Sequence, residues 1–386
     1  MLDDIEKVNE GIRTSSGFSI KVSKSVFTNA LSHVQSVVER RNIIPILSNV
    51  LIEAKESEIR LTATDMDIIV SETISASVNI PGVITVDAHM LYDIVRKLDD
   101  GLEVQIDFNV EKGKIIILSN KCSFSLSVLS AKDFPKLDDD IYSTNFQVKA
   151  DEFRGLVDQC KFAISAEETR YNLNGIFMHF FNGHLRMVAT DGHRLSCADG
   201  DDRSDISDFE GIIIPKKSII EARKVIDSVS GEISIGVSDN KIKISNEDFV
   251  FVSKLIGAKF PDYQNLMPED NNIIVQMSSK DFSKAVDRIS TITNEKFKGI
   301  KFELESDKFI VSSKNDDGSF ANETLSVNSS SGDKFEVGFN ARYISDVMSV
   351  VKGETITFKF KDNFSPAVVL DSVNEKFQYI IMPMRV

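Results

Sequence analysis

Leu185-Arg186-Met187-Val188-Ala189-Thr190-Asp191-Gly192-His193-Arg194-Leu195 is the stretch from which the organisation of the chain can be read. It follows Asn182-Gly183, a pair that favours a tight left-handed hairpin turn between two alternating segments. Such a turn pairs Phe181 with His184, Phe180 with Leu185 and Met178 with Met187. The stretch therefore predicts the second strand of a hairpin, which continues into a polar turn.

The predicted hairpin has two unlike faces because side chains alternate along a strand. One face is apolar and is expected in the core, and its residues are Ile176, Met178, Phe180, Leu185, Met187 and Ala189. The other face is more polar and carries His179, Phe181, His184 and Arg186.

The same pattern occurs twice more in the chain. Ile59, Leu61 and Ala63 precede Asp65, and Phe309, Val311 and Ser313 precede Asn315, as Leu185, Met187 and Ala189 precede Asp191. A spacing of about 125 residues is the size of a domain and is too long for a solenoid repeat. The chain is predicted to contain one domain three times, at 17–141, 145–268 and 271–386, after a flexible N-terminal extension at 1–16.

Each predicted domain contains two amphipathic helices and many short strands. The helices are expected from Ser25, from a cap at Asp87, and over 151–164, 216–229, 279–292 and 340–351, and the first long strand over 46–52. Strands at short intervals with only two helices per domain favour helices packed on antiparallel sheets, an α+β fold, over a parallel doubly wound fold.

Composition limits the possible functions. The net charge is −14, with 42% apolar and 27% charged residues, so that any contact with nucleic acid must be local. Three cysteines without metal-ligand spacing are typical of a reducing compartment. The chain starts without a signal-like segment and has no run of apolar residues as long as a bilayer is thick, so a cytoplasmic protein without membrane contact is expected.

Positive charge on the predicted helices gives the local contact that nucleic acid would need. Lys280, Lys284 and Arg288 are spaced to form one helical stripe, and Arg154 and Lys161 lie seven residues apart. Acidic residues are concentrated in loops and strands. Because this segregation recurs in all three repeats, it favours a basic helical surface that meets phosphates over ordinary solvated lysines.

Six segments in order along the chain resemble the bacterial DNA polymerase III beta subunits, the sliding clamps. They are Ile44-Pro-Ile-Leu-Ser-Asn-Val-Leu-Ile-Glu53, Arg170-Tyr-Asn-Leu-Asn-Gly175, Ala189-Thr-Asp-Gly-His-Arg-Leu195, Lys259-Phe-Pro-Asp-Tyr263, Asn294-Glu-Lys-Phe-Lys-Gly299 and Tyr379-Ile-Ile-Met-Pro-Met-Arg-Val386. Each segment alone is weakly specific, but together they cover the chain from about Gly17 onward.

The resemblance implies a non-catalytic protein without a cofactor or metal. Two chains of three clamp domains would join head to tail as a homodimeric ring, with helices lining the hole. The ring would hold duplex DNA without reading its sequence and would give DNA polymerase processivity in chromosomal replication. Its partners would be the DNA polymerase III alpha subunit, clamp-loader subunits and other polymerases, each bound through a short hydrophobic tail peptide.

The resemblance also assigns site residues. The peptide pocket would comprise Leu173, Thr190, Gly192, His193, Arg194, Leu195, Pro261, Leu266, Phe297, Asn340, Tyr343, Phe364, Pro366, Ile380, Ile381, Met382, Pro383 and Met384. DNA-facing residues would be Arg41, Arg170, Tyr171, Lys216 and Lys217. The dimer interface would include Phe124, Leu126, Thr291 and Ile292. Asn265 and Thr291 depart from the family pattern, which often has arginine and a large apolar residue there.

Other readings of the same residues remain. In a hydrolase, His193 could act as the general base and Asp191 could orient it, but no nucleophile accompanies them. His179 and His184 could hold a metal, although two surface histidines are the better account. A scaffold that does not bind DNA could also be built from a triplicated domain.

Overall fold

The computed structural model describes residues 16–110, 112–135, 140–203, 209, 211–293, 298–305, 307–329 and 334–385. By their internal contacts these residues form two compact units, one from residues 1–150 and 220–254 and the other from 151–219 and 255–386. Almost all of the predicted extension, residues 1–15, lies outside the described residues.

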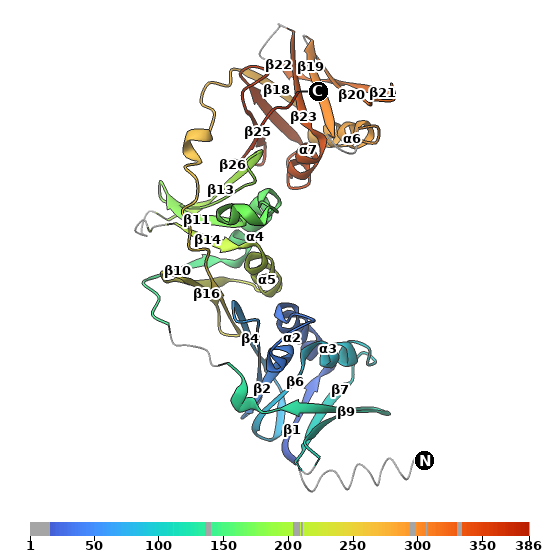
Figure 1. Ribbon diagram of the computed structural model, residues 1–386, viewed down its shortest axis with the longest axis vertical. Coiled ribbons are helices and arrows are strands. Elements are labelled where there is room, and N and C mark those ends of the chain that lie inside the picture. The colour runs from blue at the N-terminus through green and yellow to red at the C-terminus, as the bar shows by residue number, and fades with distance from the viewer. Residues whose placement is uncertain are drawn as a thin grey trace. The chain divides into compact units, whose positions relative to one another are not determined.

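The first unit is dominated by antiparallel strands, with helices α2 and α3 beside them (Figure 1). Its elements are β1 (Ser16–Ser23), α2 (Lys24–Val37), η1 (Pro45–Ser48), β2 (Asn49–Lys55), β3 (Glu58–Thr64), β4 (Ile68–Ser75), β5 (Ser77–Ile80), β6 (Gly82–Asp87), α3 (Ala88–Arg96), β7 (Glu103–Asn109), β8 (Lys114–Ser119), β9 (Cys122–Leu129), η2 (Ala131–Asp133), β10 (Thr144–Lys149), β15 (Glu232–Val237), β16 (Lys241–Ser245) and β17 (Phe249–Lys254).

One sheet runs through the first unit, in the order β10-β15-β16-β17-β4-β3-β2-β6-β9-β8-β7-β1-β5. Segments far apart in sequence meet where β17 pairs with β4, with Phe249 opposite Glu72. Helix α2 packs on α3 and on strands β3 and β4. The buried side of α2 includes Phe27, Leu31 and Val34, as its apolar spacing predicts.

The second unit contains most of the remaining helices and two further sheets, while residues 220–226 of α5 belong to the first unit. Its elements are α4 (Ala150–Cys160), η3 (Lys161–Ala163), η4 (Glu168–Leu173), β11 (Gly175–Phe181), β12 (His184–Thr190), β13 (Arg194–Asp202), β14 (Ile212–Pro215), the start of α5 (Lys216–Ile226), η5 (Gln264–Leu266), β18 (Ile273–Ser278), α6 (Ser279–Ser290), β19 (Gly299–Glu305), β20 (Lys308–Lys314), β21 (Phe320–Ser326), β22 (Asn328–Ser329), β23 (Phe335–Asn340), α7 (Ala341–Met348), β24 (Thr355–Phe360), β25 (Ala367–Asp371) and β26 (Asn374–Ile381).

The predicted hairpin at Asn182-Gly183 is confirmed in its register. Phe181 lies opposite His184, Phe180 opposite Leu185 and Met178 opposite Met187. Asn182 and Gly183 have φ of 50° and 78°, the left-handed conformation that such a turn requires. The apolar face is buried along its whole length, with Ile176, Met178, Leu185, Met187 and Ala189 fully inaccessible.

Strand β13, which follows this hairpin, connects it to the end of the chain. It pairs with β12 on one side and with β26 on the other, where Arg194 lies opposite Ile381 and Leu195 opposite Ile380. The resulting sheet has the order β14-β11-β12-β13-β26-β25-β24-β18-β22. The stretch from Leu185 to Leu195 thus leads directly to the C-terminal strand, although almost two hundred residues separate them in the sequence.

The repeat is visible in the hydrogen bonds of two turns. Asp191 Oδ1 accepts from the backbone N–H groups of His193 and Arg194, and Asp65 Oδ1 accepts from those of Asp67 and Ile68 in the same way. In both turns the preceding threonine donates its hydroxyl to the carbonyl that closes the turn. The aspartates are therefore turn residues, because a short carboxylate can replace backbone partners where a strand ends.

Three local predictions need correction. Residues 46–48 belong to the 3-10 helix η1, not to a strand, because Pro45 favours a helical start and cannot donate to a ladder. The short strand β5 was not predicted. His179 is not a surface histidine: it is 8% exposed. The predicted helices are all present in the described residues, with ends that differ by a few residues.

In the described part of the chain, no helix combines the length and the apolar character needed to cross a membrane.

The cysteines provide a test of this packing. Cys160 and Cys197 are buried and free, whereas Cys122 is exposed on β9. Burial raises the pKa of the Cys197 thiol to about 12 and that of Cys160 further. Since the thiolate is the reactive form, iodoacetamide at about pH 8 should alkylate only Cys122 in the native protein and all three cysteines in urea. Peptide mass spectrometry would measure this, and native alkylation of Cys197 at the rate of Cys122 would contradict it.

Candidate functional site

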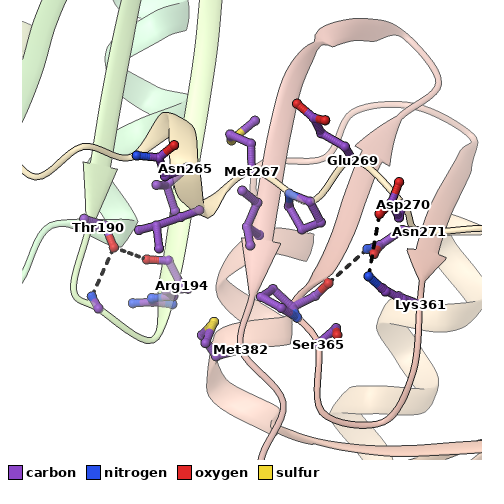
Figure 2. A pocket seen from close by; sticks show the side chains of 16 residues that line it. Thr190, Arg194, Asn265, Met267, Glu269, Asp270, Asn271, Lys361, Ser365 and Met382 are labelled. Atoms are coloured by element: carbon purple, nitrogen blue, oxygen red, sulfur yellow. Dashed lines mark hydrogen bonds and ion pairs between the residues drawn. The ribbon is translucent and has the colours of Figure 1, made fainter.

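A cavity of about 330 Å³ lies in the second unit, where the hairpin stretch meets the C-terminal strand (Figure 2). Four segments contribute to it: the turn after β12, the segment between β17 and β18, the loop between β24 and β25, and the end of β26. Its lining residues are Thr190, Gly192, Arg194, Leu195, Asn265, Leu266, Met267, Pro268, Glu269, Asp270, Asn271, Lys361, Ser365, Pro366, Ile380 and Met382.

The floor of the cavity is apolar and buried, and its rim carries apolar side chains that remain partly exposed. Leu195 and Ile380 are buried neighbours in the β13–β26 ladder. Leu266 and Met382 keep 53% and 42% of their surface exposed. Exposed apolar side chains around a buried apolar floor fit an apolar ligand, and methionine adapts its shape to different ligands.

The turn on one side of the cavity needs a glycine. Gly192 has φ of 88°, a region that side chains rarely allow. A Cβ on it would also lie 2.6 Å from the guanidinium of Arg170. That guanidinium donates from Nη1 to the Asp191 carbonyl at 2.9 Å. Arg170 therefore closes over the turn, and a side chain at residue 192 would strain the backbone and displace the end of the Arg170 side chain.

Arg194 joins the turn to helix α7. Its side chain is 8% exposed; Nε pairs with Asp191 Oδ2 at 3.1 Å and Nη1 with Asp346 Oδ2 at 2.6 Å. Nη2 donates to the Phe162 carbonyl at 2.8 Å, and the guanidinium lies 4.5 Å from the ring centre of Tyr343. Such an arrangement satisfies a buried cation with two carboxylates, a carbonyl and an aromatic face.

The opposite wall is held by aromatic contacts. Phe260 stacks on Phe177 with ring centres 4.8 Å apart. Tyr263 is 3% exposed and its hydroxyl lies 2.9 Å from His179 Nε2. Since His179 Nδ1 faces the Phe180 carbonyl, which can only accept, Nδ1 carries the proton and Nε2 accepts from Tyr263. Burial raises the pKa of Tyr263, which keeps its hydroxyl protonated as a donor. These contacts fix the segment that delivers Leu266 and Met267 to the cavity.

The structure brings together eight of the residues assigned to the peptide pocket. Thr190, Gly192, Arg194, Leu195, Leu266, Pro366, Ile380 and Met382 line the cavity. Three more, Phe364, Pro383 and Met384, line a separate hollow of about 470 Å³ in the same unit. The chain end after β26 borders both hollows, and the backbone N–H groups of Met382 and Met384 donate to the carbonyls of His193 and Gly338.

The other assigned pocket residues support these walls. Leu173 and Ile381 are buried in the core. His193 stacks on Tyr343 with ring centres 6.1 Å apart, and Asn340 caps α7 by accepting from the Arg342 N–H. Pro261 lies between the anchoring residues Phe260 and Tyr263. Phe297 lies outside the described residues.

The assignment missed one end of the cavity. Met267, Pro268, Glu269, Asp270 and Asn271 follow the anchored segment directly, so their position next to Leu266 was a usable signal. Lys361 and Ser365 come from the loop between β24 and β25. There Asp362 Oδ1 accepts from the N–H groups of Phe364 and Ser365, a turn of the same kind as at Asp191. Asn265, the predicted departure, donates to Asp262 at 2.8 Å.

Four of the five residues assigned to DNA are exposed, and three of these, Tyr171, Lys216 and Lys217, lie on adjoining segments. Tyr171 is 61% exposed, and Lys216 and Lys217 are exposed at the start of α5. The Lys216 N–H donates to the Asn174 carbonyl at 2.9 Å, which places the two segments side by side. Arg41 is exposed in the first unit. Arg170 differs, because it is also bound to the turn beside the cavity.

Many cations of the predicted basic helices are already paired with acids. Arg154 pairs with Asp151 and Lys161 with Asp158, one helical turn earlier. Arg288 pairs with Glu323 on β21, whereas Lys280 and Lys284 are exposed on the same side of α6. The three cations on α6 are therefore exposed on one side of that helix, as the spacing predicts, whereas the charges of Arg154 and Lys161 are largely neutralised.

The residues of the hydrolytic alternative do not form a dyad. The carboxylate of Asp191 is turned onto its own backbone and onto Arg194, while the ring of His193 lies against Tyr343. His179 and His184 bind separate partners, Tyr263 and the Gly200 carbonyl. Within the described residues, no three histidine, cysteine, aspartate or glutamate side chains are placed to hold a metal.

Comparisons with known proteins cover nearly the whole chain. The family models of the DNA polymerase III beta subunit match here in succession: the N-terminal domain over residues 18–138, the central domain over 147–262 and the C-terminal domain over 264–385. The beta sliding clamp of Caulobacter vibrioides is 39% identical over 371 residues, which are 95% of this chain and 100% of that protein. That of Pseudomonas aeruginosa is 33% identical, over 94% of this chain and 99% of that protein.

Solved structures give the same result. A Caulobacter crescentus beta sliding clamp superposes with a TM-score of 0.91 at 39% identity, covering 96% of this chain and 99% of that chain. A sliding clamp from Bartonella birtlesii, solved bound to griselimycin, has a TM-score of 0.89 at 38% identity and covers 96% of this chain and 100% of that one. The fold, three tandem clamp domains of helices on antiparallel sheets, is therefore confirmed.

The anchored wall of the cavity can be tested at Tyr263. Replacing Tyr263 by phenylalanine removes one hydroxyl and leaves His179 Nε2 buried without that partner. We expect the free energy of unfolding to fall by about 1–3 kcal/mol, measured by urea denaturation. Tyr171→Phe is the matched control, because its side chain is exposed, and it should leave stability unchanged. A Tyr263→Phe protein as stable as the parent would show that the anchor is not needed.

Proposed function

Because the chain belongs to the DNA polymerase III beta subunit family, the sliding clamps, we propose that it closes as a head-to-tail homodimeric ring around duplex DNA and holds DNA polymerase there through the cavity. The chain is not an enzyme; it is the non-catalytic clamp that gives the polymerase processivity in replication. Tethering keeps the polymerase near the primer end at high effective concentration, with no chemical step by the clamp.

The cavity is the observation that carries this proposal. It combines an apolar floor at Leu195 and Ile380 with exposed Leu266 and Met382, and its walls are held by Arg194 and Tyr263. A short hydrophobic tail peptide fits these features, because apolar side chains gain most where floor and walls are already in place. The tails would belong to the DNA polymerase III alpha subunit, to clamp-loader subunits and to other polymerases.

Two open strand edges support ring closure. Strand β21 ends its sheet and pairs with β20 on one side; β9 pairs with β8 along its length and with β6 only at Val128 and Leu129, within the described residues. Open edges are templates for pairing with another chain. Because the two edges are different surfaces of one chain, a contact between β9 of one chain and β21 of its partner is head to tail, and two such contacts would close the proposed ring.

Side chains beside these edges fit the assigned interface. Phe124 on β9 is 36% exposed and borders a hollow of about 460 Å³ that Met90 and Ile94 of α3 also line. Leu126 lies further along β9. Ile292 is half-buried just after α6, the helix whose Arg288 pairs with Glu323 on β21, and Thr291 ends that helix. We assign Phe124, Leu126, Thr291 and Ile292 to the interface on this basis.

The paired cations suit a ring that slides. Arg41, Arg170, Tyr171, Lys216 and Lys217 would meet phosphates, together with Lys280 and Lys284. Each phosphate that a lysine or arginine neutralises releases counterions and so strengthens binding to DNA. A ring with many unpaired cations would therefore bind DNA too tightly to slide. Neutralised helix cations and a net charge of −14 keep the contact weak.

The same proposal includes domain limits of 17–141, 145–268 and 271–386 and a cytoplasmic location.

Closed and linear DNA separate a ring from a surface binder. Protein placed on nicked circular plasmid by a clamp loader should stay with the DNA in gel filtration and be lost once a restriction enzyme opens the circle. Ile292→Asp puts an unpaired charge in the interface, so it should sediment as a monomer and stay on neither DNA. Equal retention on circular and linear DNA would instead support a scaffold that grips phosphates.

The tail pocket is tested by shortening its methionines. Met382→Ala with Met384→Ala removes exposed apolar surface from both hollows, so calorimetry should show at least a tenfold loss of affinity for a polymerase tail peptide. The dimer should persist, because neither residue lies on β9 or β21. Peptide affinity equal to that of the parent would refute the pocket assignment.

A further inference from the structure

We propose that the end of the cavity formed by Glu269, Asp270 and Asn271 selects partner tails that carry a basic side chain beside their apolar residues. The inference rests on the proposed function, because it names which tails the same cavity prefers.

Asn271 supplies a buried acceptor at this end. Its side chain is 8% exposed, and its Nδ2 donates to the carbonyls of Lys359 and Pro366, each at 2.9 Å. Because both carbonyls can only accept, the amide cannot be flipped and Oδ1 must be the other atom. Asn271 Oδ1 is buried and has no partner in the structure. A buried acceptor without a donor costs free energy. A ligand N–H that hydrogen-bonds to Asn271 Oδ1 would therefore contribute more to binding than an N–H that bonds to an acceptor already exposed to water.

The charges at the same end are mainly negative. Glu269 and Asp270 are exposed, and Lys361 is the one lining cation near them. Lys361 Nζ lies 3.6 Å from Asp270 Oδ2, so its charge is partly used (Figure 2). No ion pair of Glu269 is seen among the described residues. Its carboxylate is therefore available to a cation on a bound tail.

The far side of the cavity does not offset this charge. Arg194 is the lining cation there, and its guanidinium is consumed by Asp191 and Asp346. Asn265 is neutral and donates to Asp262. A tail with an acidic flank would therefore meet carboxylates without a free cation among the described lining residues, whereas a lysine or arginine flank would be complementary.

Four capped peptides test the preference. They share one neutral apolar core of leucine and phenylalanine and carry a lysine or a glutamate at either end, since the direction of the tail is open. At about 50 mM salt, fluorescence anisotropy should give a lysine peptide about fivefold tighter than its glutamate twin for at least one end. At about 500 mM salt the difference should shrink because exposed charges are screened.

The preference should be removed by two isosteric changes. Glu269→Gln with Asp270→Asn keeps shape and exposed position, so folding is preserved, and the lysine-to-glutamate affinity ratio should fall to about one. Glu375→Gln is the matched control, because it removes an exposed carboxylate at the start of β26, outside the cavity lining, and should keep the parent ratio.

The outcomes separate this inference from the pocket itself. A glutamate peptide that binds as well as its lysine twin, or a ratio unchanged in the Glu269→Gln, Asp270→Asn protein, would overturn the preference while the apolar core still binds. If the apolar core binds neither the parent nor any variant, or binds the Met382→Ala, Met384→Ala protein equally well, then the pocket assignment has failed instead.

Discussion

The buried guanidinium of Arg194 is the interaction on which the site depends. It sits at the start of β13, and it reaches two carboxylates, Asp191 in its own turn and Asp346 on α7. Removing a buried charge from such a set leaves its partners uncompensated, which costs far more than an exposed pair would. The turn beside the cavity and helix α7 are therefore tied together through Arg194, which fixes one wall of the cavity.

Sheet continuity gives the second constraint. Strand β13 is shared between the hairpin and the C-terminal β26, just as β17 and β4 join distant segments in the first unit. The open edges of β9 and β21 are the ones that the proposed ring closure would use. A clamp must be stable within each chain, yet its two chains must be able to separate. Strand pairing serves both needs, because the paired strands within a chain are also joined covalently, whereas those between two chains are not.

The clamp reconciles holding DNA with moving along it by limiting its own charge. Arg154, Lys161 and Arg288 face carboxylates within one turn or on a neighbouring strand. In the proposed ring, retention on DNA relies on closure instead of affinity for DNA, and the cavity is the surface that would bind partners. The proposed selection among partners would then lie in the polar end of the cavity, where Asn271 and Glu269 present acceptors.

The sequence by itself determined the repeat, the hairpin register and the fold class, because alternation and an Asn-Gly turn are local signals with few solutions. Its resemblance to the family also predicted eight of the cavity residues, six of which lie in the matching segments. Tertiary structure alone decided the rest. His179 is buried because Tyr263, distant in sequence, covers it, and Glu269, Asp270 and Asn271 join the cavity because aromatic contacts fix the path of the segment before them. Neither result follows from local pattern, since both depend on where a distant segment comes to rest.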